Sequence, residues 1–214
     1  MTTKKVLRLI ARIAIFGALA IILYMVPGLQ FPIIPGLSFL KVHFDEIPCL
    51  IASLAYGPLT GTLLVVIKGL FKLIQDVGET GGIGVLADLI YGLALILPAS
   101  FIYKKMHNFK GAIIGLSVGF IVNLLFSSFL GYYIIYPLYG FYFNPEVGGY
   151  VNALQYIVDH MFSPVDPSIK YRYDFKIQYQ FLLPFNVIKN LIIVGATLLV
   201  YKPVSILIDK ANKE

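Results

Sequence analysis

Charged side chains are scarce in this chain of 214 residues. Asp, Glu, Lys and Arg together make up 13% of it, whereas hydrophobic residues make up 58%. A soluble domain has about 25% charged and about 45–50% apolar residues. This composition excludes an ordinary water-soluble globular protein and predicts an all-α integral membrane protein.

Several chemical signatures are also missing. The single cysteine, Cys49, excludes an internal disulfide. No G-x-x-x-x-G-K-[ST] stretch is present, so the chain has no P-loop for ATP phosphates. Three histidines stand far apart without metal-binding spacing, and no catalytic residue set is recognisable. The basic residues behind the net charge of +6 are scattered along helix ends, which argues against a nucleic-acid partner.

Apolar runs predict one membrane domain, residues 1–214, with six helices. A retained first helix, long enough to span a bilayer, is favoured over a cleaved signal peptide because no A-x-A-like site follows it. Asp45 is expected to cap the second helix, and the second and third helices are both expected to be short. The predicted ranges are 6–25, 46–56, 58–75, 85–103, 111–135 and 182–201.

Between these helices the sequence predicts structured outer loops at 27–44, 76–84 and 137–180. Residues 145–180 form an extended extracellular loop in this prediction, with a short surface helix near 151–161. The glycine-rich stretch 76–84 is either a plain turn or a backbone nest that approaches a ligand.

The basic residues indicate an orientation. Ten of the seventeen Lys and Arg residues fall on the side that holds both termini, four fall on the other side, and three lie in or near the membrane. Because positive charge is enriched on the cytoplasmic side of membrane proteins, both termini are predicted to be cytoplasmic in the plasma membrane.

Lys189 is the most informative single residue. It lies about two turns inside the last helix, where an ionisable side chain is costly and marks a functional site with a partner. Asn186 precedes it by three residues, so both project from one helix face. Asn190 lies about 100° round the helix and is expected to make a structural contact.

Other polar residues within the predicted helices need partners as well. Lys72 is expected to snorkel or to pair with Asp76, four residues later. Asp88 is expected to meet Lys68 or a ligand group. Asn123 is expected to form a hydrogen bond between helices.

Small residues line one side of the first helix. Ala14 and Ala18, together with Ala11 and Gly17, let another helix approach closely. That helix belongs either to this chain or to a separate membrane subunit.

Longer motifs resemble a known family. "FLKVHFDEIPCLIASLAYGPLTGTLLVVIKGL" and "GIGVLADLIYGLALILPASFIYKK" are similar to the substrate-binding (S) components of energy-coupling factor (ECF) vitamin transporters. "YPLYG" and the P-F-N-x-x-K motif in "LPFNVIKN" look most like the riboflavin type. The resemblance covers nearly the whole chain except residues 145–180.

The resemblance implies a function and a set of site residues. It implies a high-affinity subunit for riboflavin uptake, with riboflavin or a close flavin as the transported ligand rather than as a cofactor. The implied partners are an ECF transmembrane coupling subunit, which meets Ala14 and Ala18, and two ATPase subunits. The residues expected to bind the vitamin come from loop one, the start of the fourth helix and the last helix: Leu40, His43, Asp45, Gly84, Asp88, Asn186 and Lys189.

Three residues depart from the riboflavin-type pattern. His43 stands where an aspartate is usual, and Gly131 and Asp88 stand where asparagines are common. These departures leave open a shifted pose, a flavin nucleotide or a different vitamin or small molecule. Two functions of another class also stay open. One is a small integral-membrane enzyme, which would need clustered acidic residues or histidines; Asp45-Glu46 is the one pair of adjacent acidic residues in the sequence. The second is an assembly subunit without a ligand.

Overall fold

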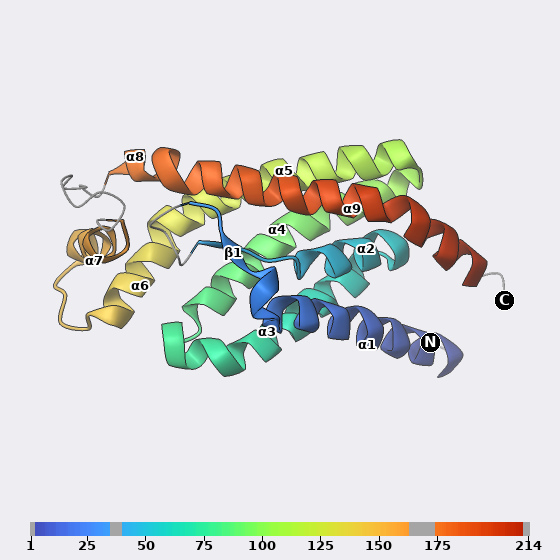
Figure 1. Ribbon diagram of the computed structural model, residues 1–214, viewed down its shortest axis with the longest axis horizontal. Coiled ribbons are helices and arrows are strands. Elements are labelled where there is room, and N and C mark those ends of the chain that lie inside the picture. Colours follow the sequence, from blue (N-terminus) through green and yellow to red (C-terminus); the bar gives the residue numbers. More distant parts are fainter. Residues whose placement is uncertain (1–2, 35–39, 163–173, 212–214) are drawn as a thin grey trace.

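The computed structural model describes residues 3–34, 40–162 and 174–211, and within them the chain is mostly helical. Lys170, Arg172 and residues 35–39 of the first predicted outer loop lie outside the described residues. Most of the chain runs along one direction, and both termini lie at the same end of the helical body (Figure 1). The helices are α1 Thr3–Met25, α2 Glu46–Tyr56, α3 Pro58–Thr80, α4 Ile83–Met106, α5 Phe109–Leu130, α6 Tyr136–Phe143, α7 Tyr150–Ile157, α8 Phe175–Ile177 and α9 Leu183–Ala211.

Four segments of the described chain are long and apolar enough to cross a bilayer: Val6–Met25, Ile83–Met106, Phe109–Phe143 and Gln178–Tyr201. Large apolar side chains such as Ile15, Ile74 and Leu199 are exposed on the outside of the helices. An apolar exterior of this kind is the surface that a helix presents to lipid.

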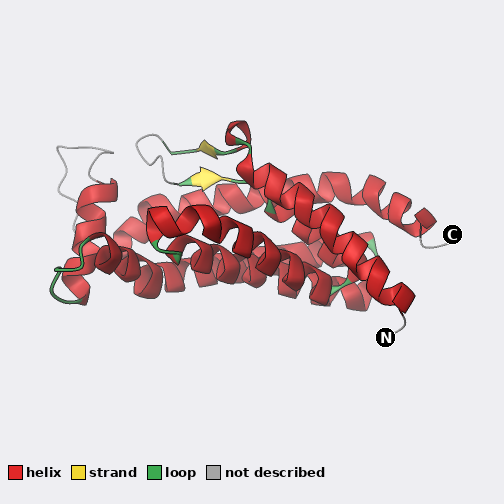
Figure 2. Ribbon diagram, turned by 90° about the horizontal axis from the view of Figure 1, so that it is seen from below, coloured by secondary structure: helices red, strands yellow, loops and turns green. Residues whose placement is uncertain are grey.

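The first loop is structured, as the sequence predicts. A 3₁₀ turn at Pro27–Leu29 leads into a two-residue strand, β1 (Phe31–Pro32), which pairs antiparallel with β2 (Lys41–Val42). Figure 2 shows these strands on one side of the helical body. The loop therefore folds back towards the end of α1 rather than extending away from it.

The second helix agrees with the sequence and the third does not. Helix α2 has 11 residues, as expected, but α3 has 23, which at 1.5 Å per residue is about 34 Å. The prediction that helix three is short is therefore wrong. Residues 76–80, including Gly78, continue the helix. The turn consists of Gly81 and Gly82, whose positive φ angles of 64° and 86° end the helix.

The fifth helix also extends further than its predicted end at residue 135. A π-helical segment, Gly131–Ile135, joins α5 to α6, so the aromatic stretch up to Phe143 is helical and not a loop. Pro137 is the second residue of α6, so it lies two positions after the last residue of the π segment. The predicted surface helix is confirmed as α7, which continues into a π-helical segment, Val158–Phe162.

The last helical run begins earlier than the predicted residue 182 and ends later. Helix α8 starts it at Phe175, so residues 175–180 are helical and not part of the outer loop. A π-helical segment, Gln178–Leu182, precedes α9, which continues through Pro203 to Ala211 instead of ending at residue 201. The C-terminal basic tail is thus helical as far as the described chain extends. Figure 1 shows α9 lying beside α5 along the body.

Close packing and polar contacts fix the central helices. A Cβ atom at Gly115 of α5 would lie 2.5 Å from the carbonyl oxygen of Ala99 in α4, so only glycine allows this approach. The side chain of Asn190 donates to Asn123 Oδ1 at 2.7 Å, and Asn123 donates to the Tyr91 carbonyl oxygen at 2.7 Å. The predicted interhelical role of Asn123 and the structural role of Asn190 are both confirmed.

Candidate substrate-binding site

A cavity of about 680 Å³ is lined by residues of the first loop, the turn between α3 and α4, α6 and the start of α9. These parts of the chain lie away from the end of the body that holds the termini (Figure 1). Small-molecule sites measure about 300–1,000 Å³. Its wall combines charged groups with aromatic rings, namely Lys41, Lys72, Asp76, Glu79, Asp88 and Lys189, and Tyr24, Tyr91, Tyr136, Tyr139, Phe143 and Phe185. A smaller hollow of about 90 Å³, which Lys72 also lines, lies between α1 and α3.

The structure brings together most of the residues that the sequence singles out. Six of the seven predicted vitamin-binding residues line the cavity: Leu40, His43, Gly84, Asp88, Asn186 and Lys189. They come from three parts of the chain, namely the first loop, the start of α4 and α9, which are separated by up to about 150 positions. Their contact with a ligand stays a prediction.

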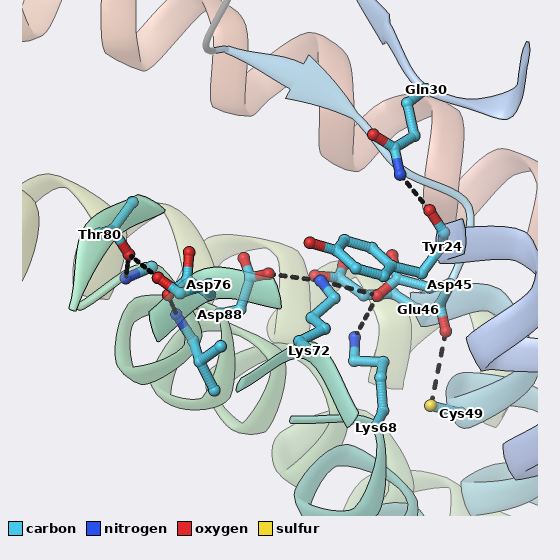
Figure 3. Close-up of polar contacts among 12 residues, drawn as sticks. Tyr24, Gln30, Asp45, Glu46, Cys49, Lys68, Lys72, Asp76, Thr80 and Asp88 are labelled. Carbon is cyan, nitrogen blue, oxygen red and sulfur yellow. Dashed lines mark hydrogen bonds and ion pairs between the residues drawn. The ribbon is translucent and has the colours of Figure 1, made fainter. Parts of the chain in front are cut away.

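Asp45 differs from these six because its side chain turns into the protein. It makes no capping hydrogen bond to α2, contrary to expectation. Its Oδ2 atom instead lies 2.8 Å from Lys68 Nζ and 3.1 Å from Lys72 Nζ (Figure 3). Two ammonium groups attract the carboxylate more strongly than the neutral N–H groups of the helix start do.

These charges form a buried network. Asp45, Lys68 and Lys72 are each at most 4% exposed, and Lys72 also contacts Asp88 Oδ2 at 2.5 Å. Ion pairing of Lys68 and Lys72 is confirmed, but the partners named from the sequence, Asp76 for Lys72 and Lys68 for Asp88, are wrong. Lys68 pairs with Asp45, and Lys72 pairs with Asp45 and Asp88. Burial alone would raise the pKa of Asp45, but the two lysines hold it well below its ordinary value.

Lys189 has a partner that the sequence does not reveal. Its Nζ atom lies 3.5 Å from Glu46 Oε1, and Glu46 is only 3% exposed. The second carboxylate oxygen, Glu46 Oε2, has no hydrogen-bond partner in the described part of the chain. The sequence draws attention to Glu46 only through the acidic pair Asp45-Glu46 before an apolar helix. Nothing in the spacing connects Glu46 with Lys189, which lies 143 positions away.

Tyr24, at the end of α1, joins the first loop to the network. Its ring lies 3.9 Å from Lys72 Nζ and stacks on His43 with centroids 5.3 Å apart. Gln30 donates a hydrogen bond to the Tyr24 carbonyl oxygen (Figure 3). Burial, helped by the charge of Lys72, lowers the pKa of His43 to about 4, so this ring is neutral at pH 7.

The glycine-rich start of α4 forms another part of the wall. Gly84 N–H donates to Thr80 Oγ1 at 3.1 Å, and Val85 N–H donates to Asp76 Oδ2 at 3.0 Å (Figure 3). These are N–H groups that a helix start leaves free for a cap or an anion. Side chains of α3 take them, so the stretch is a capped turn between two helices.

Comparison with known proteins identifies the class. A family model described as "ECF transporter, substrate-specific component" matches residues 8–205. The chain belongs to this family. It is a transporter component and not an enzyme, so a membrane enzyme is excluded.

Several relatives of this S component carry the name of one vitamin. "Riboflavin transporter RibU" of Staphylococcus aureus (strain TCH60) is 27% identical over 191 residues, covering 89% of this chain and 88% of the relative. "Riboflavin transporter FmnP" of Bacillus subtilis (strain 168) is 33% identical over 138 residues, covering 63% of this chain and 72% of the relative.

A solved structure supports the fold of the S component. The chain titled "Structure and mechanism of the S component of a bacterial ECF transporter" superposes with a TM-score of 0.65 at 23% identity. The match covers 94% of this chain and 96% of that one. At this identity the likeness shows the arrangement of helices and nothing about the ligand.

The small-residue face of α1 divides into two parts in this S component. Gly17 is buried, and a Cβ atom there would lie 3.5 Å from a methyl group of Leu64 in α3. Ala11, Ala14 and Ala18 are exposed on the outer side of the helix. The chain itself therefore uses the glycine, while the three alanines stay accessible to another molecule.

Proposed function

We propose that this S component binds riboflavin with high affinity in the 680 Å³ cavity and delivers it for uptake. The observation that carries the proposal is the convergence of Asn186 and Lys189 with aromatic rings on one cavity of the right size. The relatives RibU and FmnP, which bear the name of riboflavin transporters, support the choice of vitamin.

The chemistry of the wall suits a flavin. The ring system has flat apolar faces, which stack on aromatic side chains, and one polar edge with carbonyl and N–H groups. Asn186 offers both a donor and an acceptor to that edge, and Lys189 offers an ammonium donor. His43 also lines the cavity, but its Nδ1 atom is fully buried and has no hydrogen-bond partner among the described residues.

The direct test is to purify the protein in detergent and identify what it carries. A yellow preparation with one flavin per chain in native mass spectrometry is the expected result, and added riboflavin should saturate any empty fraction. A different bound small molecule would keep the transporter class and discard the flavin. A protein that holds nothing and ignores added riboflavin would refute the choice of vitamin.

The orientation in the membrane is part of the proposal. The chain crosses the plasma membrane six times, both termini are cytoplasmic, and the cavity opens to the outside. The shared end of the two termini and the position of the cavity at the opposite end support this arrangement. A cysteine placed at the exposed Gly148 should react with an impermeant thiol reagent in intact cells; protection there would reverse the orientation.

Energy for uptake comes from separate chains in this proposal. The S component joins an ECF transmembrane coupling subunit and two ATPase subunits, and α1 supplies the contact through Ala14 and Ala18. Both alanines are exposed and lie one turn apart on the same face. Small side chains let two helices approach closely in lipid, where packing drives association.

Replacing Ala14 or Ala18 with tryptophan should therefore abolish co-purification with the coupling subunit and leave riboflavin binding unchanged. The matched control is Leu19→Trp, since Leu19 is 46% exposed and lies about 100° round the helix from Ala18. The assignment is contradicted if the alanine variants and the Leu19→Trp control lose the coupling subunit to the same extent, or if none of them loses it.

A further inference from the structure

Besides the exposed Lys41, three features of the cavity wall are of the kind that bind phosphate. Lys72 and Lys189 are cations that line the cavity with little exposure, at 4% and 15%. The third is the start of α4, where backbone N–H groups point outward from a helix whose dipole favours an anion. A vitamin that carries a phosphate would need at least one of these groups without a partner from the chain itself.

Lys72 and Lys189 are already neutralised by the chain itself. Lys72 lies 2.5 Å from Asp88 Oδ2 and 3.1 Å from Asp45 Oδ2. Lys189 lies 3.5 Å from Glu46 Oε1. Asp88 is the member of these pairs that faces the cavity most openly, because its side chain is 35% exposed and lines the wall.

The start of α4 is occupied in the same way. Asp76 Oδ2 accepts the N–H of Val85 at 3.0 Å, and Thr80 Oγ1 accepts the N–H of Gly84 at 3.1 Å. A Cβ atom at Gly84 would lie 2.8 Å from Asp76 Oδ1, so the carboxylate lies directly on the glycine surface. An internal anion thus fills the position that a phosphate would take.

The charges of the wall balance. Its cations are Lys41, Lys72 and Lys189, its carboxylates are Asp76, Glu79 and Asp88, and His43 is neutral at pH 7. A phosphate monoester brings about −1.5 to −2 charges at that pH. Lys41 forms no ion pair among the described residues, but it is exposed, so water and salt screen its charge. The buried cations have no charge to spare for a phosphate, and the carboxylates of the wall repel it as well.

We infer that Asp88 is a specificity-determining residue: by neutralising Lys72 in the cavity wall, it favours the uncharged vitamin over its phosphorylated form. Asp76 acts in the same direction at the start of α4. The inference rests on the proposed function, since it concerns the choice between riboflavin and riboflavin 5′-phosphate.

The test compares both ligands on the purified full-length chain by titration calorimetry or fluorescence quenching. We expect wild type to bind riboflavin at least about tenfold more tightly than riboflavin 5′-phosphate, which corresponds to about 1.4 kcal/mol. In Asp88→Asn, Lys72 regains a net charge and the preference should fall by about tenfold. Asp159→Asn, which removes an exposed carboxylate outside the cavity, should leave the ratio unchanged.

Two further measurements keep the inference open to refutation. Asp76→Asn should lower the preference as well, and it serves as the test if Asp88→Asn does not fold. The inference is overturned if wild type binds the phosphate ester as tightly as riboflavin, or if both folded variants keep the wild-type ratio. Failure to bind either ligand would instead refute the proposed function.

Discussion

Asp45→Asn is expected to destabilise the protein by about 3–5 kcal/mol, the usual cost of removing one partner from a buried ion pair. Asp45 is the carboxylate shared by Lys68 and Lys72, at 2.8 and 3.1 Å. The substitution keeps the shape of the side chain and removes its charge. Lys72 retains Asp88, whereas Lys68, at 2% exposure, loses the carboxylate that compensates its burial.

Thermal unfolding in detergent, followed by circular dichroism, measures this effect. A loss of that size lowers the Tm of a chain of about this length by about 6–20 °C. Asp159→Asn is the matched control, because the exposed Asp159 undergoes the same chemical change without leaving a buried charge.

A second substitution separates charge from packing. Adding Lys68→Met to Asp45→Asn removes the uncompensated ammonium, and most of the lost Tm should return, since an apolar side chain replaces a buried ion at little cost. If the single variant has the Tm of wild type, or if the double variant has a lower Tm than the single variant, the ion-pair network does not stabilise this region.

A helix end can be read from the sequence where glycine and proline stand next to each other. Tyr56-Gly57-Pro58 separates α2 from α3 as predicted, because Gly57 adopts a φ of 97° that other residues avoid. The same reasoning places the end of α3 too early, at residue 75. Gly78 lies inside the helix, whereas Gly81 and Gly82 have positive φ angles and end it. The sequence shows three glycines here but not which of them adopts a positive φ angle.

The site is predictable in part for a similar reason. Asn186 and Lys189 are three residues apart, so helical periodicity alone places them on one face. Pairing between distant residues has no periodicity to reveal it. Asp45 with Lys68 and Lys72, and Glu46 with Lys189, depend on how α2 packs between α3 and α9, which is a property of the whole fold.

The pairing with Glu46 also changes what Lys189 does. From the sequence, Lys189 is explained either by a ligand or by snorkelling of its ammonium towards the outer headgroups. In the structure a buried carboxylate stands beside it, so the ammonium has both a partner and a face towards the cavity. The resting pair holds the ammonium in place at the wall, and its remaining donors are available to the vitamin.

Lys189→Met should therefore weaken riboflavin binding by about 10- to 150-fold, because hydrogen bonds from a charged donor contribute about 1.5–3 kcal/mol. The same change leaves Glu46 buried without its partner and should lower the Tm as well. Titration of the purified variant gives the first effect, and thermal unfolding without ligand gives the second.

The double variant Lys189→Met with Glu46→Gln distinguishes the two roles of Lys189. Glutamine has nearly the shape of glutamate but no charge, so the buried carboxylate is gone and the Tm should recover. Binding should stay weak, since the ammonium donor is still missing. Recovery of both properties would mean that Lys189 serves only to neutralise Glu46, and wild-type affinity in the single variant would remove Lys189 from the binding site altogether.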